Sequence, residues 1–376
     1  MSAAAASVSL SQPALTQGLH KLERQLEAQL FERDPSGTQP TEAGSILASR
    51  AGAAFSALAE AARGGRRVFA KPEQLMTSTQ LHATLALADA GSFAGAAVAT
   101  GISQPAIHRA VRDLEQICGM RIADRQGRGV VLTAAGRRIV RGIRLASAEI
   151  AAGIADVSIS PDRAIRITIG AMPLCRALVL PHAIAAFVSA APHAALDIVE
   201  GSWRELVEPL REGRIDLMIG ALRPAPLPGL EQRPLFDDHL AVVGRAGHPL
   251  AYVATPTTDQ LRQFGWIVGQ PGTPLRSHWE ALFSGHPPPP TPVECGSVMV
   301  IRGVLAASDL LTLLSPDQVA LETDSQVLTL IGQPGSPATR TIGITTRTGW
   351  RPTGAQERLI TLIEHAARET RLRQIE

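Results

Sequence analysis

The stretch SFAGAAVATGISQPAIHRAVRDLEQICGMRIADRQGRGVVLTAAG, residues 92–136, decides the fold of the N-terminal part of the chain. Ser92 is a typical helix-capping residue before a short apolar helix, and Thr100-Gly101 ends that helix. Ser103, with Pro105 in the first turn, caps a second helix on which apolar residues recur every three or four positions. The pattern predicts a helix, a turn and a second helix around a small core.

The outward face of the second helix carries polar and basic side chains. The residues predicted to contact DNA on this helix are Ser103, Gln104, Pro105, His108, Arg109 and Arg112. Amide and arginine side chains read base edges in the major groove, and a helix N-terminus accepts a phosphate. An ordinary solvated helix face is the alternative interpretation.

The residues after this helix favour the DNA-binding interpretation. Residues 124–129 form a polar, glycine-rich turn that contains Arg125 and Arg128, and the strand-like residues 130–132 follow. Such a basic turn is typical of a wing that lies along a phosphate backbone. A long helix then opens at residues 133–136.

LysR-type bacterial transcriptional regulators have an N-terminal domain that this stretch resembles. The resemblance rests on Ser103-Gln104-Pro105-Ala106, Leu114-Glu115, Arg125 and Leu132-Thr133-Ala134-Ala135-Gly136, in this order. It implies a winged helix-turn-helix whose recognition helix starts at Ser-Gln-Pro, and a following helix that pairs two subunits. Many members have a serine where this chain has His108, so base contacts cannot be copied from relatives.

The same motif occurs once more near the N-terminus. Ser11-Gln12-Pro13-Ala14 matches residues 103–106 at an offset of 92, since 103 minus 11 is 92, and the same offset relates Leu22-Glu23, Thr41 and Gly44 to later counterparts. A constant offset without gaps predicts a tandem duplication. Because the chain begins inside the repeating unit, we expect the first copy to lack the counterpart of residues 79–92.

Two roles are open for this truncated first copy, which with its linker spans residues 1–71. As an accessory DNA-binding module it would use Ser11, Gln12, Thr16 and Arg33. As a structural element it would pack on its neighbour or on a partner subunit. We favour the structural role because its turn carries less positive charge than the turn of the second copy.

The charge of the chain is unevenly distributed. The 376 residues have a net charge of +2, yet residues 78–144 hold 9 arginines against 4 acids, whereas residues 145–376 hold 19 basic and 23 acidic residues. Positive charge therefore concentrates where the DNA-binding motif lies. With 45% hydrophobic residues, the chain has the composition of a globular protein of several domains.

The three cysteines indicate a reducing compartment. Cys118, Cys175 and Cys295 are odd in number, far apart and outside any Cys-x-x-Cys spacing. Residues 1–6 have no signal-peptide pattern, and the long apolar segment 298–314 is interrupted by charges. We expect a cytoplasmic protein with no membrane partner.

Four regions are predicted for the whole chain. After residues 1–71 we expect a complete winged helix-turn-helix at 75–136 and a linker helix at 137–160. An apolar stripe runs along the linker helix and consists of Ile139, Ile143, Ala146, Ile150 and Ile154. The stripe is a candidate seam for a homodimer or homotetramer, and packing on its own subunit is the alternative.

The remaining residues, 161–376, alternate strand and helix patterns, which predicts an α/β fold with parallel strands. The family resemblance implies a two-lobed effector domain like type 2 periplasmic binding proteins. We expect lobe I at about 161–238 and 325–376 and lobe II at about 239–324, with residues 310–314 returning to lobe I.

A ligand of such a fold lies between the lobes, where strand ends and helix N-termini converge. The candidate effector-binding residues are Met172, Pro173, Ser202, Trp203, Ala221, Leu222, Thr273, Arg276, Ser297 and Met299. Arg276 would clamp a carboxylate. Helix capping alone is the commoner role for Ser202, which forms a Ser-x-x-Glu box with Glu205, and for Thr273 and Ser297.

Several segments of the effector domain resemble one branch of the family, which includes galactose-binding-protein and protocatechuate-pathway regulators. The matching segments are 272–276, 279–283, 298–302 and 308–315. The resemblance implies a small sugar or an aromatic acid as inducer, and we favour an aromatic or other carboxylated catabolite. Double-stranded promoter DNA is then the main partner, with RNA polymerase if the protein is an activator.

Other classes of function find less support. The chain has no nucleophile elbow, phosphate-binding loop, metalloprotease motif or zinc spacing, so we expect neither an enzyme nor a metal or cofactor. A small-solute-binding protein with a helical accessory domain is one alternative. A thiol redox-sensing regulator is another, because Cys175 follows the first strand of the effector domain.

Overall fold

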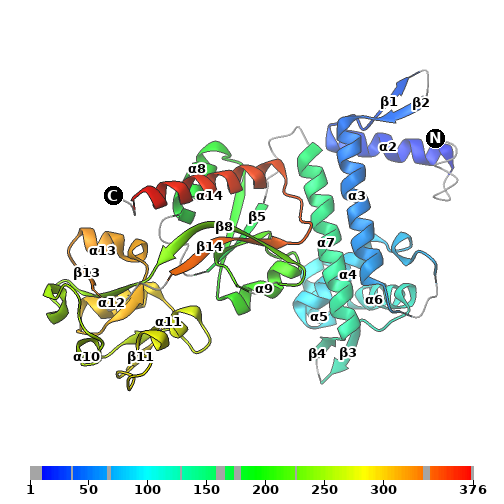
Figure 1. Cartoon of the computed structure of the whole chain (residues 1–376). Coiled ribbons are helices and arrows are strands. Elements are labelled where there is room, and N and C mark those ends of the chain that lie inside the picture. The colour runs from blue at the N-terminus through cyan, green and yellow to red at the C-terminus, as the bar shows by residue number, and fades with distance from the viewer. Residues whose placement is uncertain are drawn as a thin grey trace. The chain divides into compact units, whose positions relative to one another are not determined.

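The computed structural model contains two compact units (Figure 1). Unit 1 comprises residues 1–165 with 211–214 and 351–356, and unit 2 comprises residues 166–210, 215–350 and 357–376. The structure describes residues 11–34, 37–65, 69–127, 129–157, 166–172, 179–224, 227–332 and 339–373. The predictions made for Arg128, Pro173 and Cys175 fall outside the described residues.

A winged helix-turn-helix forms the part of unit 1 around residues 78–132. Its elements are α4 (Ser78–Ala90), α5 (Phe93–Thr100), α6 (Gln104–Cys118) and the hairpin of β3 (Ala123–Gln126) with β4 (Gly129–Leu132). The Ser92 hydroxyl accepts a hydrogen bond from the Gly95 N–H at 3.0 Å, which caps α5 as predicted. Gly101 ends α5 in the left-handed region, at φ 68°.

The turn between α5 and α6 orients α6 so that one face is buried. Ile107, Val111 and Leu114 are buried at the predicted helical spacing. Ser103 lies at the N-cap position, but its side chain accepts no capping hydrogen bond, so the capping role predicted for its hydroxyl is wrong.

Among the described residues no single helix is long and apolar enough to cross a membrane, although α4 and α5, joined at a 118° bend, meet that test as a pair by length and composition only.

The N-terminal residues repeat most of these elements 92 positions earlier. They form α2 (Gln12–Leu26), β1 (Phe31–Asp34), β2 (Gly37–Pro40) and α3 (Glu42–Ala61), which match α6, β3, β4 and the start of α7 (Ala134–Val157). Thr41 Oγ1 donates to the Gln29 carbonyl at 2.7 Å, and Thr133 Oγ1 donates to the Arg121 carbonyl at 2.7 Å. Equivalent residues therefore make equivalent hydrogen bonds.

The long helices α3 and α7 lie side by side within unit 1 (Figure 1). A shared core buries Leu58 and Ala61 of α3 with Ile139, Ile143 and Ala146 of α7. The predicted stripe of α7 thus packs, at these positions, against a helix of the same chain. A seam formed by a second subunit along this part of the stripe, the interpretation we preferred, does not agree with this packing.

Lobe I of unit 2 is built on a five-stranded sheet. The strand order is β6 (Ala195–Glu200), β5 (Arg166–Ala171), β7 (Leu217–Ala221), β14 (Thr339–Arg347) and β8 (Leu230–His239). As expected for an α/β fold, β5 is parallel to both β6 and β7, whereas β14 is antiparallel to β7 and β8. The helices of this lobe are α8 (Val179–Ala190), α9 (Trp203–Arg211) and α14 (Gly354–Arg373).

Lobe II contains a three-stranded antiparallel sheet. Its order is β12 (Thr312–Leu314), β9 (Ala241–Arg245) and β13 (Leu328–Ile331). The parallel pair of β10 (Ile267–Val268) with β11 (Val293–Glu294) and the helices α10 (Thr258–Leu261), α11 (Pro274–Leu282), α12 (Val298–Ala306) and α13 (Ala320–Asp324) complete it.

The return to lobe I occurs later than we predicted. Residues 312–314 pair with β9 in lobe II, and so does β13, which lies beyond the predicted boundary at about 325. The chain rejoins the five-stranded sheet only with β14. An apolar strand pattern shows that a strand is buried but not which sheet it joins, which explains the error.

Candidate nucleic-acid interface and effector site

The exposed face of α6 carries the side chains predicted to contact DNA. Gln104, His108, Arg109 and Arg112 are all exposed, whereas Ile107 between them is fully buried. The His108 ring lies 4.9 Å from the Phe93 ring, centroid to centroid, which positions the imidazole on the domain surface. A helix with this division can lie in a groove of DNA without exposing the core.

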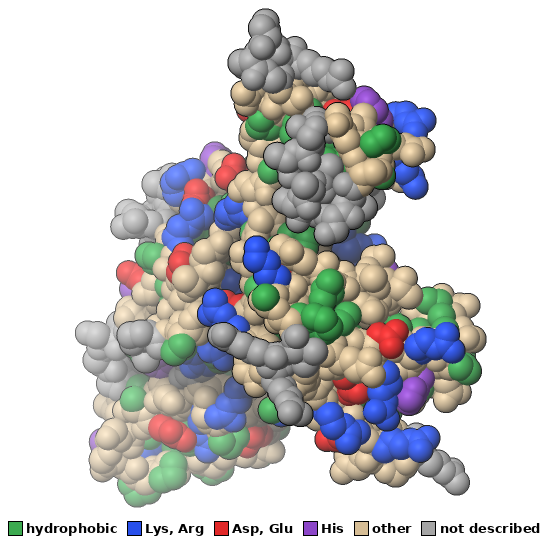
Figure 2. All heavy atoms as spheres, turned by 90° about the vertical axis from the view of Figure 1, so that its right-hand side faces the viewer, with side chains coloured by type: hydrophobic (Ala, Val, Ile, Leu, Met, Phe, Trp, Pro, Cys, Tyr) green, Lys and Arg blue, Asp and Glu red, His purple; other side chains and the backbone are tan. Residues whose placement is uncertain are grey.

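The wing adds a further exposed arginine to Arg109 and Arg112 of α6. Arg125 is exposed on β3, and Gly127, at φ 59°, forms the turn to β4. The wing is held to the domain because the Val130 N–H donates to the Gly91 carbonyl at 3.0 Å. On the face of unit 1 drawn in Figure 2, Lys and Arg side chains gather at the lower right, over this part of the chain.

The four predicted accessory residues of the first copy lie at the start of α2 and on β1. Ser11 caps α2 through a 3.3 Å hydrogen bond from the Ala14 N–H, and Gln12 is exposed. Thr16 is only partly exposed, and its hydroxyl donates to the Gln12 carbonyl at 2.9 Å. Arg33 lies on β1, in the position of Arg125. The hydroxyls of Ser11 and Thr16 thus both make hydrogen bonds within α2.

The effector-site candidates of lobe I lie near two arginines that sequence reasoning missed. The Arg223 guanidinium stacks 5.2 Å from the centroid of the Trp203 ring. The Arg204 guanidinium lies beside Gly272 of lobe II, so that a Cβ added there would come within 3.0 Å of it. Burial lowers the pKa of Arg223, and the nearby charge of Arg204 lowers it further. An anion between these residues would relieve their repulsion.

Two predicted polar contacts are already used within the protein. Ser202 donates its hydroxyl and its backbone N–H to Glu205 Oε2, each at 2.7 Å, which is the glutamate half of the capping box. Thr273 caps α11, accepting from the Arg276 N–H at 3.4 Å and donating to the Gln270 carbonyl at 2.7 Å. The Thr273 hydroxyl thus caps α11, and the Ser202 hydroxyl is engaged as a donor to Glu205.

Arg276 is likewise engaged. Its Nε donates to Glu280 at 3.0 Å, and its guanidinium lies 5.0 Å from the centroid of the Trp279 ring. Ser297 and Met299 are exposed, the latter by 77%, and the Ser297 side chain makes no capping hydrogen bond. These residues do not form a common cluster with Arg276 among the described contacts.

Met172 is a core residue and not a cleft residue, which corrects our prediction. It is 7% exposed, belongs to the lobe I cluster with Leu206 and Met218, and lies over Gly220. Ala221 and Leu222 are partly buried, and the Leu222 N–H donates to the Thr341 carbonyl at 2.8 Å. A position after a strand does not by itself turn a side chain toward the ligand.

A buried ion pair joins the two crossings between the lobes. Asp238, at the end of β8, accepts from Arg340 Nε at 2.8 Å and from the Ser315 hydroxyl at 2.6 Å. Asp238 is 2% exposed. Because Ser315 belongs to lobe II and Arg340 begins β14 of lobe I, one carboxylate ties both lobes at their junction.

A DNA-binding helix-turn-helix followed by a two-lobed ligand-binding domain defines a ligand-responsive transcriptional regulator. Residues 162–368 match the LysR substrate binding domain. Residues 1–45 and 78–137 match the bacterial regulatory helix-turn-helix protein, lysR family. The chain belongs to the LysR family of transcriptional regulators, which are DNA-binding proteins with an effector-binding domain and not enzymes.

Characterised relatives agree with this membership. The chain is 30% identical to the HTH-type transcriptional regulator GalR of Pseudomonas putida over 96% of this chain and 91% of the relative. It is 26% identical to the HTH-type transcriptional regulator PcaQ of Agrobacterium fabrum over 71% of this chain and 88% of that one.

A solved structure also resembles the chain. A full-length OxyR variant of Pseudomonas aeruginosa is similar with a TM-score of 0.60 and 25% identity, over 78% of this chain and 95% of that chain. Over the matched residues the fold is therefore that of a LysR-type regulator.

Proposed function

We propose that this regulator binds promoter DNA through α6 and the β3–β4 wing, and that a small-molecule effector in unit 2 alters that binding. The observation that carries the proposal is the exposed set Gln104, His108, Arg109 and Arg112, on a helix whose opposite face is buried. A protein that binds promoter DNA would act in the cytoplasm, where we propose that it is located. Association into a homodimer or homotetramer, and contact with RNA polymerase if it is an activator, are part of the proposal.

We also propose that residues 1–71 are a partial duplicate of the DNA-binding domain. The shared offset of 92, the matched element bounds and the equivalent hydrogen bonds of Thr41 and Thr133 support this. So does the family match of both 1–45 and 78–137. We assign the duplicate a structural role because its recognition helix carries no exposed arginine at the positions of Arg109 and Arg112.

The DNA-binding residues are tested by the double substitution Arg109→Ala with Arg125→Ala. With a duplex from the promoter region upstream of the protein's own gene, we expect affinity to fall at least about tenfold. The slope of log affinity against log salt should flatten by about 2, because two phosphate contacts are lost. Fluorescence anisotropy at several salt concentrations measures both quantities.

The control for this experiment is Arg166→Ala, which removes an exposed arginine from the first residue of β5. It should leave affinity and salt slope unchanged. An unchanged slope in the double variant would show that these two arginines do not contact phosphates and would reject the interface.

For the effector we propose an aromatic carboxylate held by Arg204 and Arg223. The stacking of Arg223 on Trp203, the lowered pKa of Arg223 and the proximity of Arg204 to Gly272 support an anion site between the lobes. Trp203 would provide an apolar surface for the ring of the ligand. Thr273 and Ser202 then serve to order the helix ends that frame the site.

Protocatechuate, benzoate and catechol are suitable probes, since catechol has the ring hydroxyls of protocatechuate without its carboxylate. We expect the two acids to raise the thermal unfolding midpoint and catechol not to do so. Arg223→Met should abolish the rise, whereas Arg166→Ala should preserve it. Equal effects of catechol and protocatechuate would reject the carboxylate.

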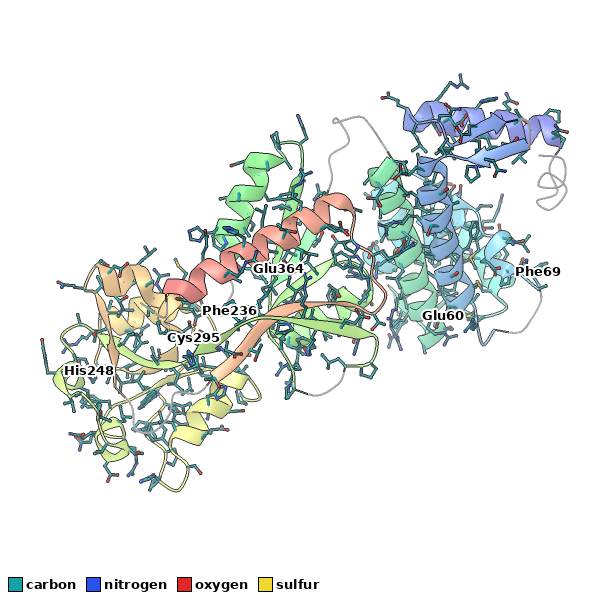
Figure 3. All side chains as sticks on the ribbon, turned by 45° about the horizontal axis from the view of Figure 1, so that its top comes forward. Glu60, Phe69, Phe236, His248, Cys295 and Glu364 are labelled. Atoms are coloured by element: carbon teal, nitrogen blue, oxygen red, sulfur yellow. The ribbon has the colours of Figure 1, made fainter. Side chains whose placement is uncertain are left out.

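Thiol sensing is the second candidate, since one similar structure is an OxyR. Cys118 is buried, and burial raises the pKa of its thiol to about 11, which disfavours the reactive thiolate. Cys295, in lobe II (Figure 3), is partly buried beside Ser297. Cys175, the residue behind the redox-sensing prediction, lies outside the described residues. We favour the carboxylate effector because of the contacts of Arg204 and Arg223.

A further inference from the structure

The contacts between α3 and α7 correspond to each other when the two helices are exchanged. Gly142 of α7 lies against Ala61 of α3, and Gly153 lies against Arg50, where an added Cβ would come within 2.9 Å of the Arg50 Cβ. Adding the offset of 92 to 50 gives 142, and adding it to 61 gives 153. The helices are thus antiparallel, and each contact is the counterpart of the other, as in an interface with two-fold symmetry.

The ends of the two helices follow the same rule. Gly65, just after α3, lies against the backbone of Cys118 at the end of α6. Val157, at the end of α7, packs in the cluster of Leu26 at the end of α2. Since 65 corresponds to 157 and 26 to 118, each long helix ends against the recognition helix of the other copy.

The charges on the pair, in contrast, are not symmetric. Arg50 is 6% exposed, and its guanidinium lies 3.3 Å from Glu149 and 2.9 Å from Asp156. Its other hydrogen bonds go to the carbonyl oxygens of Arg351 and Pro352, within the same unit. The carboxylates that balance the buried guanidinium both come from α7.

This asymmetry determines which pairs of helices are stable. In the same geometry, two α3 helices would place Arg50 against Ala57 and Gly64, the counterparts of Glu149 and Asp156. Two α7 helices would place both carboxylates against Gly142, the counterpart of Arg50. An α3–α3 pair would bury the Arg50 guanidinium without a carboxylate, and an α7–α7 pair would leave Asp156 without an arginine and Glu149 with Arg351 alone. The α3–α7 pair balances these charges.

We propose that α3 is the linker-helix partner of α7, supplied by the same chain in place of a second subunit. The pair makes the DNA-binding unit complete in one chain and relates two different recognition helices, α2 and α6, by a pseudo-two-fold axis. Subunits of this regulator would then associate through other surfaces. The proposal rests on the proposed function for the role of α6, but the helix pair itself requires no DNA.

Exchanging the charges in the full-length chain tests the pair. Arg50→Glu should lower the thermal unfolding midpoint of unit 1 by about 10 °C, because three carboxylates then meet in a partly buried site where only Arg351 balances them. Adding Glu149→Arg and Asp156→Arg to the same chain should recover at least half of the loss. Coexpressing the Arg50→Glu chain with a Glu149→Arg, Asp156→Arg chain should recover none of it.

Recovery in the coexpressed chains would show that α3 of one chain pairs with α7 of another and would overturn the proposal. An unchanged midpoint in Arg50→Glu would overturn it as well. The DNA affinity of the Arg109, Arg125 variant is measured separately, so loss of the proposed DNA contacts and loss of the helix pair give different results.

A steric pair of variants avoids the risk that a charge reversal prevents folding. Gly142→Ala adds a methyl group that overlaps Ala61, whereas Gly52→Ala on the exposed face of α3 meets nothing within 4 Å. We expect the first to lower the midpoint by several degrees and the second not to lower it. In an α7–α7 pair, residue 142 would face Gly153 and leave room for the methyl group. Equal midpoints of the two variants would therefore contradict the proposal.

Discussion

The helices α2 and α6 have the same length and are each followed by a hairpin, but their surroundings differ. The helices α4 and α5 cover α6, and Ile107 and Val111 are fully buried there. The corresponding Leu15 and Leu19 of α2 are only partly buried, and no helix in the described part of the first copy covers them. A hairpin and linker helix can thus form without the helices that complete a DNA-binding core.

Local contacts that both segments make explain this independence. Glu23 accepts the Leu30 N–H at 2.9 Å, and Glu115 accepts the Ile122 N–H at 2.8 Å. The exposed positions, in contrast, have diverged, since Gln17 and His20 stand where the second copy has Arg109 and Arg112. Contacts that shape the backbone occur in both segments, whereas the exposed Arg109 and Arg112 of α6 have no arginine counterpart in α2.

The largest difference in promoter binding is expected between alanine variants of two matched glycines, Gly136 and Gly44. A Cβ at Gly136 would overlap the Ile122 carbonyl, and one at Gly44 would overlap the Leu30 carbonyl. Each Gly→Ala change should cost about 3 kcal/mol of local stability, because backbone must move. Gly136→Ala should abolish promoter binding, whereas Gly44→Ala should leave most of it.

Urea unfolding and anisotropy with promoter DNA measure these two effects on the same samples. Gly52→Ala, which adds a methyl group in open space, is the control for a Gly→Ala change in a helix. If Gly44→Ala abolished DNA binding as completely as Gly136→Ala, the first copy would be an equal reader of DNA and its structural assignment would fail.

A smaller effect is expected for the chemical modification of Cys118. This residue lies in the core of the second copy, at the position that corresponds to Leu26. Both side chains are buried, at 3% and 2% exposure, and burial raises the pKa of the Cys118 thiol to about 11. The thiolate fraction therefore stays small until the pH approaches that value. At pH 8 we expect iodoacetamide to modify Cys295 in the native protein and to spare Cys118.

Peptide mass spectrometry of the labelled chain measures this difference, and the urea-unfolded chain, in which both thiols should react, is the control. Rapid labelling of native Cys118 would mean that the core beside α6 opens readily. The second copy would then be no more firmly packed than the first.

Much of the fold followed from the sequence because it depends on local patterns. The cap at Ser92, the spacing of Ile107 and Val111, and the offset of 92 each involve residues that are close in sequence or directly comparable. The partner of the α7 stripe did not follow, because periodicity identifies an apolar face but not what covers it. For the same reason β13 was assigned to the wrong lobe.

The effector site shows a similar limit. Met172 was predicted from its place after a strand, yet its side chain fills the space above Gly220. Arg204 and Arg223 were missed although they directly follow Trp203 and Leu222, which were chosen. Their proximity arises within lobe I, where α9 packs against β7, and no sequence spacing reports it.

The connection of α3 and α7 within one chain affects how their pairing depends on protein concentration. Two helices joined by a single chain meet at an effective concentration that the connecting residues determine, and this concentration does not change with the number of molecules in a cell. Helices from separate subunits instead obey mass action and separate when the protein is scarce. A regulator whose linker helices pair within one chain would keep its DNA-binding unit assembled at low abundance.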